Sequence, residues 1–106
     1  MRHHTPLAAL LLAPLLAAAQ AAAPAAAPAA EFQAQIWASG CMACHGTEGK
    51  AEGVALTIGG RQADELYGIL LAYKLGQRQG TIMQQHVKGY GDDELRRIAQ
   101  FFARFR

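Results

Sequence analysis

The sequence predicts an all-α fold, and three observations support this prediction. Apolar residues recur at helical spacing in three segments, residues 31–43, 62–75 and 92–106. Glycines are concentrated in the two stretches between these segments, residues 46–60 and 77–91, which are therefore predicted to be loops. No segment shows the strict alternation of apolar and polar residues that is typical of a half-buried strand. We expect helices joined by loops in one domain, without an internal repeat.

The first predicted helix covers residues 31–43 and places Phe32, Ile36 and Trp37 on one side. The second covers residues 62–75, with acidic side chains in its first turn and Gly76 where a C-terminal cap is expected. The third starts with three acidic residues at 92–94 and ends with arginines, an order that suits the helix dipole. The second and third helices have apolar residues at i, i+3, i+4 and i+7: Leu66, Ile69, Leu70 and Tyr73, then Leu95, Ile98, Ala99 and Phe102.

The first 30 residues differ in composition from the rest and predict an export signal. A short, potentially cationic start is followed by a run of leucine and alanine at residues 7–19, and A-x-A sites near residue 21 predict cleavage. Residues 1–21 are therefore expected to be a cleaved signal peptide. An uncleaved anchor is the alternative, but the apolar run is short for a bilayer and contains Pro14. Residues 22–30 hold only alanine and proline and are expected to be flexible, and residues 31–106 form the predicted domain.

The charge and size of this predicted domain restrict its function. Without Arg2 of the leader, nine Lys and Arg remain against eight Asp and Glu. The sequence has no basic stripe of the kind that nucleic-acid-binding proteins carry. A domain of this length is near the lower limit for a core made of apolar side chains alone, so a bound apolar group would add stability.

Cys41, Cys44 and His45 form the C-x-x-C-H pattern of covalent c-type haem attachment. The two thiols can form thioether bonds to the haem vinyl groups, and His45 can bind the iron. A thioredoxin-like motif, half of a zinc site and a short-range disulfide are the alternatives. A zinc site would need a second cluster of thiolate or imidazole ligands, and a thioredoxin motif would need a βαβ context; the sequence shows neither. An export signal favours the haem interpretation, because such haems are attached outside the cytoplasmic membrane, and it predicts a periplasmic location.

Met83 is the expected second axial ligand of the iron. Met1 belongs to the predicted leader, and Met42 lies inside the attachment motif on the proximal side. Met83 lies in a glycine-bounded segment between two predicted helices. His86 is the competing ligand, and an iron left open for a small molecule is a further alternative. A thioether ligand would raise the reduction potential, whereas a second imidazole would lower it.

Several short motifs, taken in order, resemble class I cytochrome c. They are residues 41–47 (CMACHGT), 71–76 (LAYKLG), 81–83 (TIM), 88–90 (KGY) and 94–95 (EL). The chain is most similar to the diheme cytochrome c family and to the cytochrome subunit of flavocytochrome c sulfide dehydrogenase, over residues 36–105. The resemblance implies three main helices around one covalently attached haem c. It also implies that the C-x-x-C-H motif closes the first helix, which crosses the last.

The resemblance assigns roles to the same four residues: Cys41 and Cys44 as thioether residues, His45 as the proximal ligand and Met83 as the distal ligand. In this family a backbone carbonyl near a loop proline accepts the proximal imidazole N–H. The present chain has residues 53–56 (GVAL) in that place, which leaves open which carbonyl is used. The chain also has one haem motif, whereas many relatives have a second haem domain.

The resemblance further implies which side chains surround the haem. Ile36 is expected to meet Phe101 or Phe102 where the first and last helices cross. Trp37 or Tyr73 is expected to shield the haem or to hydrogen-bond it. Independently of the resemblance, the position of Arg78 near the distal segment leads us to expect that it is solvated or pairs with a haem propionate.

The expected function is electron transfer, with no catalysis by this chain alone. The TIM and KGY motifs resemble those of the haem subunit of flavocytochrome c, and this resemblance implies a subunit that accepts electrons from a sulfide-oxidising flavoprotein; a stand-alone monohaem carrier is the alternative. Residues 22–106 contain only three lysines and have a charge near zero, which favours a persistent, partly apolar interface over long-range electrostatic steering. A haem enzyme or a gas sensor would need an open sixth position, and the presence of Met83 argues against both.

Overall fold

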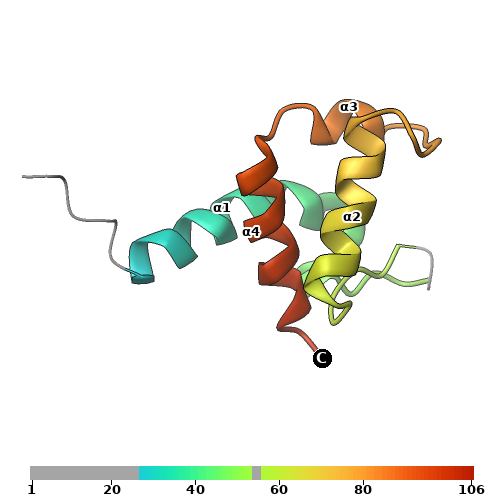
Figure 1. The fold of residues 1–106 in the computed structure, drawn as a ribbon. Coiled ribbons are helices and arrows are strands. Elements are labelled where there is room, and N and C mark those ends of the chain that lie inside the picture. The colour runs from blue at the N-terminus through green and yellow to red at the C-terminus, as the bar shows by residue number, and fades with distance from the viewer. Residues whose placement is uncertain (1–26, 54–55) are drawn as a thin grey trace, which may run out of the picture.

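The computed structural model describes residues 27–53 and 56–106 (Figure 1). Within these residues it contains four α-helices, α1 (Ala27–His45), α2 (Ala63–Lys74), α3 (Met83–Val87) and α4 (Asp92–Ala103), and the short 3-10 helix η1 (Thr47–Gly49). The described part of the chain contains no strand, so the all-α prediction is confirmed. None of its helices is long and apolar enough to cross a membrane. The expected signal peptide, residues 1–21, lies outside the described residues.

α1 begins at Ala27, earlier than the predicted start at residue 31. The end of the alanine- and proline-containing segment, which was expected to be flexible, is therefore helical from Ala27. Alanine has the highest intrinsic helix propensity, and Pro28 lies in the first turn, where a proline is tolerated because its missing N–H would have no helical partner. The preceding part of that segment is not among the described residues.

α1 and α4 pack against each other, as the resemblance implied (Figure 1). Ile36, which was expected to meet Phe101 or Phe102, does not belong to the core, because it is 48% exposed, and Phe32 on the same helix is 63% exposed. Ala38, which is fully buried, instead joins the two phenylalanines in the core. A small side chain at the crossing leaves room for the large aromatic rings of α4, so Phe32 and Ile36 lie outside the core, while Trp37 packs against it.

The core lies between α1, α2 and α4, with one contribution from α3. The apolar face predicted for the last helix is entirely buried, which confirms that prediction. In α2, Leu66 and Leu70 are buried, while Ile69 and Tyr73 are only partly buried. The buried core residues are Ala38, Leu66, Leu70, Val87, Leu95, Ile98, Ala99, Phe101 and Phe102.

α2 ends as predicted, at a glycine cap. Gly76 has a φ of +73°, which is the left-handed conformation that glycine adopts without strain. The N–H of Gln77 donates to the carbonyl of Ala72 at 2.8 Å, and the N–H of Gly76 donates to Tyr73 at 3.1 Å. These two bonds form a Schellman motif. The segment that follows, residues 77–91, was predicted to be a loop but contains α3, which Val87 anchors in the core with only 2% exposure.

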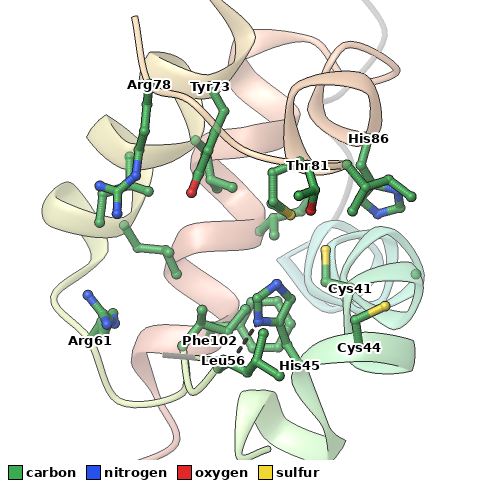
Figure 2. A pocket seen from close by; sticks show the side chains of 18 residues that line it. Cys41, Cys44, His45, Leu56, Arg61, Tyr73, Arg78, Thr81, His86 and Phe102 are labelled. Carbon is green, nitrogen blue, oxygen red and sulfur yellow. Dashed lines mark hydrogen bonds between the residues drawn. The ribbon is translucent and has the colours of Figure 1, made fainter. Parts of the chain in front are cut away.

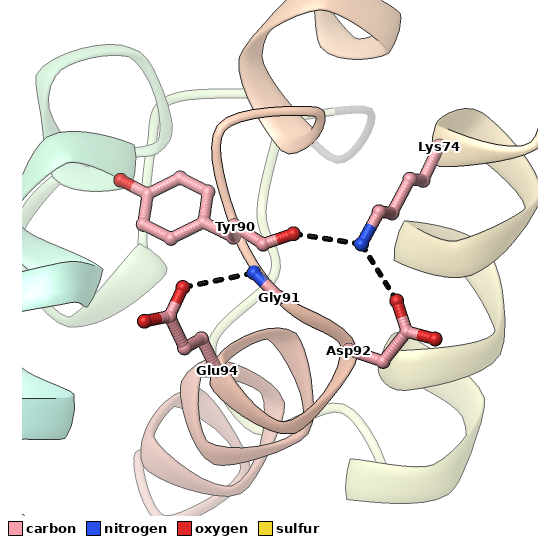
Figure 3. Close-up of polar contacts among 5 residues, drawn as sticks. All are labelled: Lys74, Tyr90, Gly91, Asp92 and Glu94. Carbon is pink, nitrogen blue, oxygen red and sulfur yellow. Dashed lines mark hydrogen bonds and ion pairs between the residues drawn. The ribbon is translucent and has the colours of Figure 1, made fainter.

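Lys74 joins the end of α2 to the start of α4 (Figure 3). Its ammonium group donates to the carbonyl oxygen of Tyr90 at 2.8 Å and to Oδ1 of Asp92 at 2.6 Å. The N–H of Gly91 donates to the Glu94 carboxylate at 2.8 Å, which satisfies a backbone donor at the beginning of α4. These contacts fix the chain between α3 and α4.

The loop after α1 folds back onto α4. Gly49 is buried with a φ of +74°, and a Cβ at this position would lie 2.8 Å from Cδ1 of Phe102. Its carbonyl accepts hydrogen bonds from Ile58 and Gly59 at 2.8 and 2.9 Å. The N–H of Gly60 donates to the carbonyl of Phe102 at 2.9 Å. The loop is therefore held at both ends, which keeps residues 56–61 close to the C-terminal end of α1.

Candidate haem site

Cys41, Cys44 and His45 lie at the C-terminal end of α1, so the motif closes the first helix as expected. The two cysteines are three residues apart, a spacing that puts their side chains on neighbouring positions of one helix face. Both thiols are free, and no disulfide joins them. Gly46 follows with a φ of +78°, and its N–H donates to Met42 at 2.9 Å. The helix thus presents both thiols and the imidazole within its final turns.

All three motif residues line one cleft of about 1090 Å³, counting the part that is open to solvent. The cleft lies between the end of α1, residues 56–61, α2, α3 and α4. Tyr73 lines it, as expected, whereas Trp37 is not among its lining residues. Most of the wall is apolar and suits a flat apolar ring system. Its apolar side chains include Leu56, Ile58, Leu70, Ile82, Ile98 and Phe102.

The imidazole of His45 is oriented by the backbone carbonyl of Leu56, which lies 2.5 Å from Nδ1 (Figure 2). Because a carbonyl oxygen can only accept, Nδ1 carries a proton, and Nε2 is the ring nitrogen left to bind a metal. A neutral imidazole with one nitrogen held in this way is the usual form of a metal-binding histidine. The question left open by the missing proline therefore has an answer: the acceptor is the carbonyl of Leu56.

Met83, the first residue of α3, is partly buried and lines the same cleft as His45. His86 lines the cleft too, but its side chain is exposed. Figure 2 shows His45 and Thr81, which is two residues before Met83, on opposite sides of the cleft, with His86 at the cysteine edge. An axial pair on the two faces of a flat group needs such an arrangement. Partial burial favours Met83 over the exposed His86, and the ligand set stays a prediction.

The environment of Cys41 argues against a thioredoxin-like role. Burial, with a smaller contribution from the neighbouring Cys44, raises the pKa of the Cys41 thiol to about 11. A thiol in a redox-active C-x-x-C motif has a lowered pKa, because the thiolate is the reactive form. The Cys41 thiol therefore remains protonated at neutral pH, unlike the reactive thiol of a thioredoxin-like motif.

Two arginines line the cleft on the side opposite the cysteines (Figure 2). The Nε of Arg61 donates to the carbonyl of Thr57 at 3.3 Å, and its guanidinium pairs with Glu65 at 3.3 Å. The guanidinium of Arg78 lies 5.2 Å from the centre of the Tyr73 ring. Sequence reasoning considered Arg78 but missed Arg61, because nothing in the local sequence shows that residues 61 and 78 approach one cleft.

These features fit a haem that is bound through its vinyl groups. Haem carries its two vinyl groups on one half of the ring and its two propionates on the other. The cleft has two thiols at one edge, two guanidinium groups at the opposite edge and apolar walls between them. Guanidinium groups bind carboxylates through charge-assisted hydrogen bonds. The donor set on this chain therefore matches the chemistry of haem c.

No family model matches the chain, but two curated proteins are similar to it. The chain is 36% identical over 72 residues to the cytochrome subunit of sulfide dehydrogenase of Chlorobaculum tepidum, a match that covers 68% of the chain and 66% of that relative. It is 35% identical over 69 residues to cytochrome c-553 of Nitratidesulfovibrio vulgaris, which covers 60% of the chain and 68% of the relative.

The chain therefore belongs to the cytochrome c family. Electron transfer through haem c is the function that this membership implies, in agreement with the all-α fold and the motif. The matches span about two thirds of the length of each relative.

Proposed function

We propose that the chain is a periplasmic monohaem cytochrome c that serves as the haem subunit of a sulfide-oxidising flavocytochrome c. In this proposal residues 1–21 are a cleaved signal peptide, and Cys41 and Cys44 bind the haem covalently. His45 and Met83 are its axial ligands. The observation that carries the proposal is that these four side chains line one apolar cleft.

Each residue of the site would have a separate role. The carbonyl of Leu56 keeps the His45 imidazole in the tautomer and orientation that present Nε2 to the cleft. Cys41 and Cys44 would anchor one edge of the haem to the end of α1, and Met83 would contribute a thioether from the first residue of α3. The apolar walls exclude water, which favours the less charged ferrous state. The bound haem itself supplies an iron that accepts and donates single electrons.

The proposed partner is a flavoprotein, and two observations support it. The relative from Chlorobaculum tepidum is named as the cytochrome subunit of a sulfide dehydrogenase. The near-zero charge expected for the mature chain also suits a lasting interface better than a brief, electrostatically steered encounter. The similarity to cytochrome c-553 supports the second candidate, a stand-alone carrier.

Purification of the native protein from its periplasm tests the partner. We expect a stoichiometric flavoprotein to be retained, and its flavin should reduce the haem after sulfide is added. Recovery of a monomer that exchanges electrons but retains no flavoprotein would establish the stand-alone carrier instead.

Covalent attachment is tested separately, by extraction with acid acetone. The haem should stay on the polypeptide, and its pyridine haemochrome should have the absorption position of a haem with two thioether bonds. Haem that is extracted freely would refute the roles of Cys41 and Cys44, whatever the partner is.

A further inference from the structure

Four residues at intervals of four form an exposed, uncharged row along α1. They are Phe32, Ile36, Gly40 and Cys44. Residues at i and i+4 lie next to each other on a helix and form one of the ridges that pack against neighbouring structures. From the rise of a helix, the row is about 18 Å long. Phe32 and Ile36 have exposed fractions of 63% and 48%, so they present large apolar side chains to solvent.

The row begins on a free side of α1 and ends at the haem cleft. The buried side of α1 is formed by Ala34 and Ala38, with exposed fractions of 8% and 0%. Figure 1 shows the N-terminal half of α1 extending beyond α4. At the other end, both Gly40 and Cys44 line the cleft. Each step of four residues turns slightly more than one full turn of the helix, so the row winds from the outer surface into the cysteine edge of the site.

The helix segment that carries the row, residues 32–45, has no acidic residue, lysine or arginine. Glu31, just before them, is engaged by Arg104 of α4. The arginines that line the cleft, Arg61 and Arg78, lie on its opposite side (Figure 2). A partner that covers this row therefore meets uncharged side chains along it, with the Glu31–Arg104 ion pair at its N-terminal end, so a mainly apolar complementary surface fits it best.

We infer that this row, from Phe32 to Cys44, is the surface on which the electron-donating flavoprotein docks. The inference rests on the proposed function and identifies the side of the cytochrome that the partner covers. An apolar patch of the flavoprotein lies against Phe32 and Ile36, and this contact directs its flavin toward the cysteine edge of the cleft. The flavoprotein is favoured over a second copy of the chain because the row ends at Gly40 and Cys44, which line the cleft, and an electron donor must approach that edge.

The test uses the full-length, haem-loaded protein and the flavoprotein that is retained with the wild type. The variants are Phe32→Gln and Ile36→Gln, since glutamine preserves helix propensity and both positions are exposed. Leu75→Gln is the matched control, because Leu75 is 65% exposed but lies at the end of α2, outside the row. Each row variant should raise the dissociation constant at least about tenfold, which is the effect of removing a large anchor from an interface. The control should leave it unchanged.

Salt provides a second measurement. The dissociation constant of the wild type should change by less than about threefold between 50 and 500 mM NaCl, because no exposed ion pairs would be screened. A fall in affinity of more than about tenfold would place the interface at a charged surface, which contradicts the proposal.

The outcomes separate the two proposals. If the wild type retains a flavoprotein and both row variants bind it equally well, the docking surface is wrong and the proposed function stands. If the wild type retains no flavoprotein, the proposed function fails and the docking surface fails with it. If the wild type is a dimer in solution that Ile36→Gln converts to a monomer, a second copy occupies the row and the inference is overturned. Haem absorbance and the unfolding midpoint of each variant verify that it is folded.

Discussion

The helix crossing that carries the haem motif gives the sharpest test of the fold, because sequence and structure disagree there. Ala38 is fully buried against α4, whereas Ile36 is 48% exposed. Ala38→Leu would force additional carbon atoms into a filled site and should cost about 2–3 kcal/mol of unfolding free energy. Leucine and alanine have similar helix propensities, so this cost would come almost entirely from packing.

Ile36→Ala is the matched substitution, with a much smaller expected cost. Full burial of an isoleucine side chain stabilises a protein by about 1.5–3 kcal/mol, and roughly half of that side chain is exposed here. The higher helix propensity of alanine offsets a few tenths of a kcal/mol of this loss in unfolding free energy. The net cost should be roughly 0.5 kcal/mol.

Thermal unfolding of the haem-loaded protein, followed by far-ultraviolet circular dichroism, measures both substitutions. At about 4–8 °C for each kcal/mol in a domain of this size, Ala38→Leu should lower the melting temperature by roughly 8 °C or more, and Ile36→Ala by no more than about 4 °C. A larger loss for Ile36→Ala than for Ala38→Leu would refute the described crossing and would restore Ile36 to the core.

Three further predictions concern the site. Met83→Ala should abolish the near-infrared sulfur-to-iron band of the ferric protein and lower its potential, while His86→Ala should leave the band in place; a band that is absent in the wild type, or that survives Met83→Ala, would favour His86 or an open site. Arg61→Gln should lower the potential and raise the pH at which the potential becomes pH-dependent, because a cation stabilises ionised propionates; voltammetry between pH 4 and 9 that shows no shift would remove Arg61 from the site. Burial raises the pKa of Tyr90 above its ordinary value near 10, so ionisation is easier in the unfolded chain and stability should fall as pH rises through about 10. Unfolding midpoints between pH 9 and 12 should show that Tyr90→Phe reduces this loss.

Local features of the chain were predictable where one strong physical signal dominates. The buried positions of α4 follow from their spacing, because one side of that helix faces the core along its whole length. Gly76 marks the end of α2 because the helix ends with a residue in the left-handed conformation, which glycine adopts without steric cost. The haem motif is contiguous, so Cys41, Cys44 and His45 could be recognised without knowledge of the fold.

Features that depend on contacts between distant segments were not predictable in the same way. Hydrophobicity ranks Ile36 above Ala38 as a core residue, yet close packing of two helices selects the smaller side chain. α3 is only five residues long, which is too short for a helical period to emerge. Arg61 and Arg78 meet at one cleft only because the loop after α1 and the segment after α2 both fold toward it.

The orientation of His45 depends on a local motif, which the sequence shows, and on a contact with a distant segment, which it does not. Every residue has a backbone carbonyl, so no side-chain pattern could identify Leu56 as the acceptor. Its position follows from the loop around it, which Gly49 and Gly60 attach to Phe102 through a close contact and a hydrogen bond. Phe102 in turn packs in the same core as Ala38, one residue of the helix that ends at His45. The α1–α4 crossing therefore determines both the place of the imidazole and the place of the carbonyl that orients it, and a substitution that disturbs the crossing should weaken the iron site as well as the fold.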